Sequence, residues 1–214
     1  MAHWLDSLRP KAGETSRGRE IIDLPLFPLG SVLFPGSLLS LKVFEARYFD
    51  MASTCLRHHT PFGVCLIAHG QEVGAPAIPH PIGTTAHIIE ANMPQAGILQ
   101  LKIQGQRRFR IISHATQTNG LLTASVKLLD EVENEGNPTL RKKLLPLLMQ
   151  IIADLGPEKI ATPHAFDSTV WVGYRLTEVL PVQPLAKQKL LEMDDPLARL
   201  EIIYAYLSQH RLIE

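Results

Sequence analysis

Prolines and glycines interrupt the most apolar stretch of the chain, and this combination excludes most of the structures open to such a stretch. Residues 24–48 read LPLFPLGSVLFPGSLLSLKVFEARY. A helix interior cannot hold Pro25, Pro28 and Pro35, because each removes an amide donor and clashes with the preceding turn. A central strand cannot hold them either, since each would break a ladder hydrogen bond. We therefore expect short extended pieces, broken by tight turns, that belong to a β-barrel or β-sheet.

Strand signals continue to about residue 130. The segment SLLSLKVF alternates apolar and polar residues, which is the period of a half-buried strand. Further strands are expected in FGVCLIA, TAHIIEANM, GILQLKIQG, RRFRIISHATQ and LLTASVKLLDEV, with Gly105 as a turn residue. The segment EARYFDMASTCLRHH changes to a helical period. Residues 70–83 are rich in proline and glycine, which predicts a long loop.

The last third of the chain has a helical period. Apolar residues recur every three or four positions in LRKKLLPLLMQIIADLG, STVWVGYRLTEVL, PLAKQKLLEM and DDPLARLEIIYAYLSQ. Ser168 and Asp195 are suited to capping two of these helices, and Pro184 to a first helical position. The acidic ENEGNP at 133–138 is typical of a linker. We expect a flexible arm at 1–20, a β-rich subdomain at 21–132 and a helical subdomain at 138–214.

Composition restricts the function classes. The 214 residues, 45% hydrophobic and 20% charged, can bury a core without disulfides or metals. The formal net charge is +0, so no overall field attracts nucleic acid or an anionic membrane. Cys55 and Cys65 form no CxxC pair and are expected to be reduced thiols. No secretory signal or long apolar run is found, which predicts a cytoplasmic protein without a membrane partner.

Motifs of common catalytic sites are missing. The sequence contains no GxxxxGK[ST], HExxH, GxSxG or GxGxxG. The nine histidines are scattered, and the adjacent pair His58 and His59 would point in different directions on a helix. We therefore expect neither a cofactor nor a metal ion.

One basic patch allows two interpretations. In KIQGQRRFRI, basic side chains surround Phe109, and such interleaving can hold single-stranded nucleic acid. On a strand, however, Arg107 and Arg108 point to opposite faces, and each face mixes charged with apolar groups. That pattern is typical of an edge strand whose long side chains reach water. The sequence favours this second interpretation.

Three segments, in this order, match the motifs of a known family. The opening run carries a leucine–proline strand, a turn and a glutamate/arginine helix start, at Leu24-Pro25, Pro28-Leu29, Phe34-Pro35-Gly36 and Glu45 with Arg47. The middle segment carries Gly105, Arg108 and Phe109. The last carries Leu180-Pro181, Lys187-Gln188, Leu190 to Glu192, Asp195 and Arg199-Leu200. Together they resemble the N-terminal, or substrate-binding, domain of Lon proteases, in its stand-alone form.

The resemblance implies a fold and a function. The fold would be α+β, a PUA-like β-pseudobarrel followed by a C-terminal α-helical bundle. The function would be non-catalytic recognition of polypeptide, as unfolded or degron-bearing segments, with a separate ATPase or protease as a candidate partner. The sequence has no phosphate-binding loop and stops before the ATPase and Ser–Lys peptidase modules of full Lon proteases. We therefore expect no ATPase and no peptidase activity.

Candidate substrate-binding residues come from two places. The proline- and glycine-rich loop offers Val73, Ile78 and Pro79, and the basic patch offers Arg108 and Phe109. The groove between barrel and helices is a further candidate surface. Two alternatives remain open at this point. One is an RNA-binding PUA-like module, against which the zero net charge argues, and the other is a barrel with a small-molecule pocket.

Overall fold

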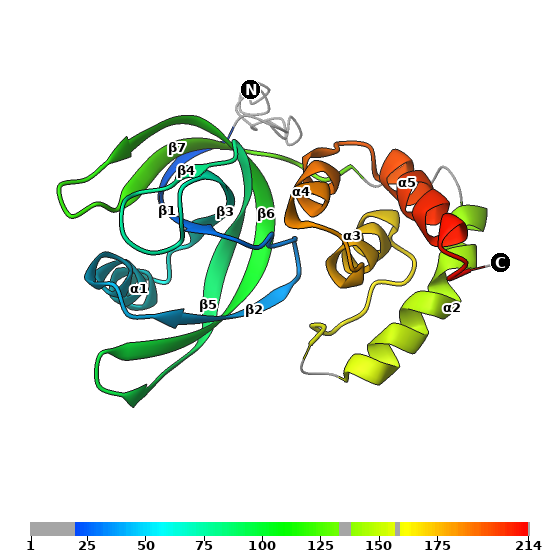
Figure 1. The fold of residues 1–214 in the computed structure, drawn as a ribbon, viewed down its shortest axis with the longest axis horizontal. Coiled ribbons are helices and arrows are strands. Elements are labelled where there is room, and N and C mark those ends of the chain that lie inside the picture. The colour runs from blue at the N-terminus through cyan, green and yellow to red at the C-terminus, as the bar shows by residue number, and fades with distance from the viewer. Residues whose placement is uncertain (1–19, 133–137, 157–158, 214) are drawn as a thin grey trace, which may run out of the picture.

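A computed structural model describes residues 20–132, 138–156 and 159–213 (Figure 1). The predicted arm at 1–20 lies outside the described residues except for Glu20, and the predicted linker at 133–138 lies outside them except for Pro138. The elements follow one another as β1 Ile21–Leu29, β2 Leu38–Val43, α1 Ala46–His58, β3 Phe62–His69, β4 Ile78–Pro79, β5 Ile82–Gln95, β6 Ile98–Thr116, β7 Leu122–Leu128, α2 Pro138–Leu155, α3 Thr169–Val179, α4 Pro184–Glu192 and α5 Pro196–Gln209.

The strands close into a ring because β1 pairs with two different neighbours. The sheet runs in the order β1-β7-β6-β5-β3, and β3 returns to β1 in a parallel pairing. The short strand β4 adds to β3, and β2 adds to β6. Helix α1 lies at one end of this ring, while α2 to α5 gather on the other side (Figure 1). The predicted α+β fold, a β-pseudobarrel followed by helices, is confirmed.

Prolines interrupt β1 less than the sequence predicts. Instead of several short pieces, residues 21–29 form one strand that contains Pro25 and Pro28. Pairing with β7 covers Ile21 to Leu26, and pairing with β3 covers Leu26 to Leu29. Each proline therefore lies where β1 has a neighbour on one side only, and its missing N–H leaves no acceptor unpaired on the other side.

Strand β6 also differs from its prediction. It is one strand of 19 residues that passes through Gly105 without a turn. Nor is it an edge strand, because it pairs with β5 on one side and with β2 and then β7 on the other. Gly105 is needed for close approach: a Cβ added there would lie 2.2 Å from the carbonyl oxygen of Phe34. The backbones exchange hydrogen bonds here, from Gly36 N to Gly105 O and from Gly105 N to Ser37 O.

The helices form where their period and caps predict. In α1, Tyr48, Ala52 and Cys55 are buried against the barrel, although Leu56, expected on the same stripe, is exposed. Ser168 accepts a hydrogen bond from the backbone N of Trp171, and Asp195 accepts two at the start of α5. Helices α2, α3 and α5 share a core of their own, which contains Leu144, Leu148, Val172, Leu176, Leu180, Leu200, Ile203 and Leu207.

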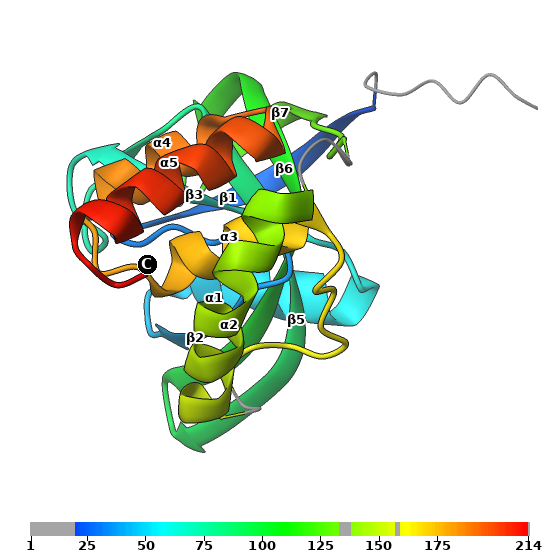
Figure 2. The ribbon, with the colours of Figure 1, turned by 90° about the vertical axis from the view of Figure 1, so that its right-hand side faces the viewer.

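A small apolar cluster joins the helices to the barrel. It combines Phe34 and Ile82 of the barrel side with Val170, Tyr174 and Leu191 of the helices. Helices α3 and α4 are nearest to the barrel, and α2 and α5 lie outside them (Figures 1 and 2). The barrel and the helices therefore meet through packed side chains as well as through the chain connection.

Substitution of Gly105 tests the close approach of β6 to Phe34. Gly105→Ala places a methyl group against a backbone carbonyl that cannot move aside, and we expect a loss of about 1–3 kcal/mol in the free energy of unfolding. Urea denaturation followed by circular dichroism measures this. Gly173→Ala in α3 is the matched control, because its Cβ meets nothing closer than 3.4 Å, and helix propensity favours alanine by ~1 kcal/mol. Equal stability of the two variants would show that the close approach of Phe34 does not require glycine at position 105.

Candidate functional site

The predicted loop is shorter in the structure than in the sequence analysis. Ile78 and Pro79 form β4 opposite β3, and β5 begins at Ile82, so only residues 70–77 and 80–81 of the predicted loop lie outside strands. Val73 is 54% exposed on this segment, and Ile78 is 55% exposed on β4. Pro79 is buried opposite Ile67. Of the loop candidates, Val73 and Ile78 therefore present apolar surface to solvent.

Contacts on both sides of Val73 hold its segment in place. The Glu72 carboxylate accepts a hydrogen bond of 2.5 Å from the backbone N–H of Gly30. The carbonyl of Gly74 accepts one of 2.6 Å from the guanidinium of Arg47. Val73 is therefore presented by a segment that is held at both neighbours, through the side chain of Glu72 and the backbone carbonyl of Gly74.

Arg47 joins three parts of the barrel. Besides Gly74, its guanidinium donates to the carboxylate of Glu45 at 2.7 Å and to the carbonyl of Gly120 at 3.2 Å. The side chain is 7% exposed, so these bonds form largely out of water, where they are stronger. The glutamate/arginine pair at the start of α1 thus ties the helix to the Val73 segment and to the turn between β6 and β7.

A groove lies beside Val73, and we call it the loop groove. Its volume is about 360 Å³. Its lining combines the end of β1, β2, the start of α1 and the Val73 segment, with residues Phe27, Pro28, Leu29, Ser31, Leu39, Ser40, Leu41, Lys42, Val43, Phe44, Glu45, Tyr48, Glu72 and Val73. Phe44, 56% exposed, and Val73 stand over a floor of buried apolar side chains. The loop groove is therefore open to solvent and combines exposed apolar side chains with polar ones.

Phe44 is a groove residue that was not predicted, although the sequence contains a signal for it. The alternation of SLLSLKVF places Phe44 on the same face as Ser40 and Lys42. An aromatic residue on the polar face of a strand exposes apolar surface without a packing reason.

A second groove lies between the barrel and the helices, and we call it the junction groove. Its volume is about 570 Å³, and its lining comes from β3, the segment after it and the start of α4, with Gly30, Leu66, Ile67, Ala68, Gly70, Gln71, Glu72, His80, Pro184 and Leu185. Leu185 is 54% exposed. Glu72 lines both grooves. The sequence predicted a candidate surface between barrel and helices, and this groove lies there.

Arg108 and Phe109 are inside the protein, which corrects their selection as surface contacts. Phe109 has no exposed surface, and its ring lies where Cβ atoms at Gly63 and Gly83 would each come within 2.7 Å of it. Arg108 is 1% exposed. Neither side chain is accessible to a polypeptide in this structure, because Phe109 packs in a core cluster of the barrel and Arg108 lies against Leu191 and Met193 of the helical part.

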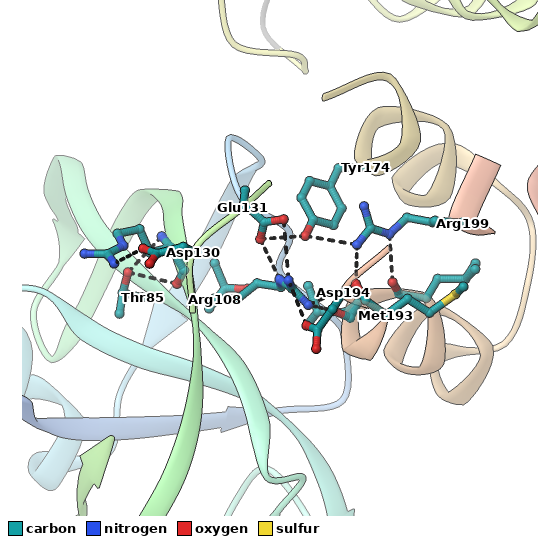
Figure 3. Close-up of polar contacts among 12 residues, drawn as sticks. Thr85, Arg108, Asp130, Glu131, Tyr174, Met193, Asp194 and Arg199 are labelled. Atoms are coloured by element: carbon teal, nitrogen blue, oxygen red, sulfur yellow. Dashed lines mark hydrogen bonds and ion pairs between the residues drawn. The ribbon is translucent and has the colours of Figure 1, made fainter. Parts of the chain in front are cut away.

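Arg108 instead connects the barrel to the helices (Figure 3). Its guanidinium donates to the Glu131 carboxylate at 2.5 Å and to the carbonyls of Leu191 and Met193 at 2.9 and 3.1 Å. It also pairs with Asp194 at 3.2 Å. Thus the strand β6, the segment after β7 and the connection between α4 and α5 meet at one buried cation.

Tyr174 and Arg199 extend this contact into the helices. The Tyr174 hydroxyl donates to Glu131 at 2.8 Å, and Arg199 donates to the Tyr174 oxygen at 3.3 Å and to the carbonyls of Leu190 and Met193 (Figure 3). Desolvation raises the pKa of Tyr174, so the phenol stays protonated and donates. Desolvation lowers the pKa of Arg199, whereas for Arg108 the surrounding Tyr174, Glu131 and Asp194 outweigh desolvation and raise it.

The remaining side chains of the basic patch are mostly paired. Arg107 contacts the carboxylates of Glu20 and Asp130 at 2.8 Å each, and Lys102 lies 3.4 Å from Glu90. With Arg108 buried, the patch does not form the open run of cations that a nucleic-acid groove needs. The RNA interpretation gains no support from this geometry.

The described residues offer little for redox or metal chemistry. No group of three or more His, Cys, Asp or Glu side chains that could hold a metal ion occurs within 20–132, 138–156 and 159–213. Cys55 and Cys65 are buried free thiols, and desolvation raises the pKa of both, which disfavours the reactive thiolate. In the same part of the chain, no helix combines the length and apolarity needed to cross a membrane.

Comparison with known proteins identifies the family. A family model described as the ATP-dependent protease La (LON) substrate-binding domain matches residues 23–209, and the chain belongs to this family. The crystal structure of a Lon N-terminal domain protein from Xanthomonas campestris is similar with a TM-score of 0.70 and 35% identity, over 86% of this chain and 98% of that chain. The N-terminal domain of a Mycobacterium avium complex Lon protease shares the fold, with a TM-score of 0.62 and 16% identity over 88% of this chain and 100% of that one.

Longer proteins match over part of their length. The Lon protease of Methylocella silvestris is 25% identical over 187 residues, which are 84% of this chain and 23% of that protein. Protein cereblon of Danio rerio is 31% identical over 113 residues, 51% of this chain and 26% of that protein. The chain thus spans about a quarter of the length of these curated relatives. The match to Lon proteases is a match to their substrate-binding domain and does not extend to their other parts.

Adjacent arginines give a matched test of the buried contact. Arg108→Met leaves Glu131 and the carbonyls of Leu191 and Met193 without their cation, and we expect a loss of about 3–5 kcal/mol in unfolding free energy. Arg107→Met removes two partly exposed ion pairs, with Glu20 and Asp130, and should cost less than about 1 kcal/mol.

Urea unfolding monitored by Trp171 fluorescence, in a Trp4→Phe background, reports the helices directly, since Trp171 lies on α3. Similar small losses in both arginine variants would show that Arg108 does not hold the helices on the barrel.

Proposed function

We propose that this protein binds apolar segments of polypeptides, in unfolded or degron-bearing form, in the loop groove, and that it does so without catalysis. The observation that carries the proposal is that two exposed apolar side chains, Phe44 and Val73, line one groove together with buried apolar side chains. Exposed apolar surface of this kind costs solubility and commonly marks an interaction site. Membership of a substrate-binding domain family supports the same interpretation.

The contacts that hold the Val73 segment in place favour binding. Because the segment with Val73 is held at Glu72 and Gly74, less conformational entropy is lost when a client segment settles against it. A client would bury the rings and methyl groups of the groove together with its own apolar side chains. The partner of this protein would be a separate ATPase or protease that acts on the bound client segment.

Removing apolar surface from the groove tests the proposal. Phe44→Asp and Val73→Asp each place a charge where a client side chain would sit, and we expect at least about a tenfold weaker affinity for a fluorescent, permanently unfolded polypeptide. Fluorescence anisotropy measures the affinity at low and high salt. Binding to the unmodified protein should persist at high salt, because burial of apolar surface is not screened.

Two variants serve as controls. Ile112→Asp changes a side chain that is 55% exposed on β6 and does not line the groove, and Ile78→Asp changes one that is equally exposed close to the Val73 segment. Because neither side chain lines the loop groove, both variants should bind as the unmodified protein does, and for Ile78 this replaces the sequence-based expectation that it contacts a substrate. If Ile78→Asp lost binding while Phe44→Asp kept it, the client surface would lie at β4 rather than in the loop groove. Binding abolished by salt alone would contradict apolar recognition.

A further inference from the structure

The loop groove touches consecutive residues of a strand, and this reveals what its wall is made of. Residues 39–43 of β2 all line the groove. Side chains of successive strand residues point to opposite faces, so one face alone could supply only every second residue. Strands β2 and β7 pair one after the other with the same side of β6, and β7 also pairs with β1 as far as Leu26. The other edge of β2 therefore faces the part of β1 beyond Leu26, and this edge forms one wall of the groove.

That edge of β2 has no neighbouring strand. Among the described residues β2 pairs with β6 alone, from Leu38↔Gln104 to Val43↔Leu99. In an antiparallel pair every second residue directs its N–H and C=O away from the partner strand. Along β2 these groups point toward the groove, and a polar backbone edge is a template for another strand.

The opposite wall differs in one respect. Phe27, Pro28 and Leu29 of β1 also line the groove, beyond the point where pairing with β7 ends at Leu26. Pro28 has no N–H, so this wall is a poor template for a strand. The two walls therefore divide the roles: β2 offers hydrogen-bonding groups and β1 offers apolar contact.

The geometry points to strand addition, an inference that rests on the proposed function. An extended client segment, apolar at alternate positions, pairs with the free edge of β2 inside the loop groove. Alternate side chains of such a segment would point to one face, toward the floor that includes Leu29 and Leu41, and the others toward solvent. Main-chain hydrogen bonds would supply affinity that depends little on client sequence, while the floor selects apolar side chains. A groove of about 360 Å³ is at the small end of ligand pockets, which suits a short segment rather than a folded partner.

Amide hydrogen exchange on β2 tests strand addition directly. The probe is a synthetic peptide of about eight residues that alternates valine and serine, slightly longer than the six residues of β2. In the free protein, the amides of β2 that face β6 should exchange slowly and the alternate ones rapidly. At saturating peptide, the alternate amides should slow by at least about tenfold, because each gains a hydrogen-bond acceptor.

The peptide itself provides the second measurement. N-methylation of every second amide gives two variants, one methylated on the edge that faces β2 and one on the opposite edge. One variant should bind at least about tenfold more weakly than the other, since a strand pairs through one edge at a time.

The outcomes separate the two proposals. If the peptide does not bind at all, the proposed function fails, and strand addition fails with it. A second outcome is that the peptide binds and Val73→Asp abolishes this binding, but exchange along β2 is unchanged. In that case the groove binds clients by side chains alone, and strand addition is wrong. Equal affinity of the two N-methylated variants would overturn it as well. Slower exchange at alternate β2 amides together with unequal affinities supports it.

Discussion

A cation removed from water determines how the helices sit on the barrel. Arg108 projects from β6 with 1% of its side chain exposed, and a buried charge without partners costs several kcal/mol. Its partners come from the segment after β7 and from the connection between α4 and α5. The charge is therefore satisfied only when these elements are all in place. Arg175, also buried, adds a second link from α3 to the carbonyl of Pro35 at 2.7 Å.

Local patterns in the sequence predicted the elements well because their causes are local. The helix caps at Ser168 and Asp195, the alternation of β2 and the period of α1 each depend on residues a few positions apart. The misjudged features depend on distant partners. Gly105 looked like a turn residue, but it is a glycine because Phe34 approaches it from another part of the barrel. Pro25 and Pro28 looked like strand breakers, but β1 exchanges one neighbour for another between them.

The residues of the candidate site, too, were predicted only where the cause is local in the sequence. Val73 could be selected from the sequence because loops rich in proline and glycine lie at surfaces. Arg108 and Phe109 were selected for their residue types. Phe109 is buried by ring closure, which involves pairings such as Leu26↔Gly63, and Arg108 is buried against the helices, and a sequence alone shows neither. Phe44 was identifiable from the alternation of β2, but its meaning depends on the groove that Val73 completes. Residue type indicates chemistry, whereas accessibility is decided by tertiary structure.

The division of contacts around Val73 has a consequence for modularity. Every residue that lines the loop groove lies between Phe27 and Val73, and the anchors at Gly30, Arg47 and Gly120 also belong to the barrel. The junction groove, in contrast, needs Pro184 and Leu185 of the helical part. The lining and the anchors of the loop groove thus come from the barrel alone, whatever helices are attached to it. The junction groove exists only while barrel and helices stay together, so its presence indicates that their interface is intact.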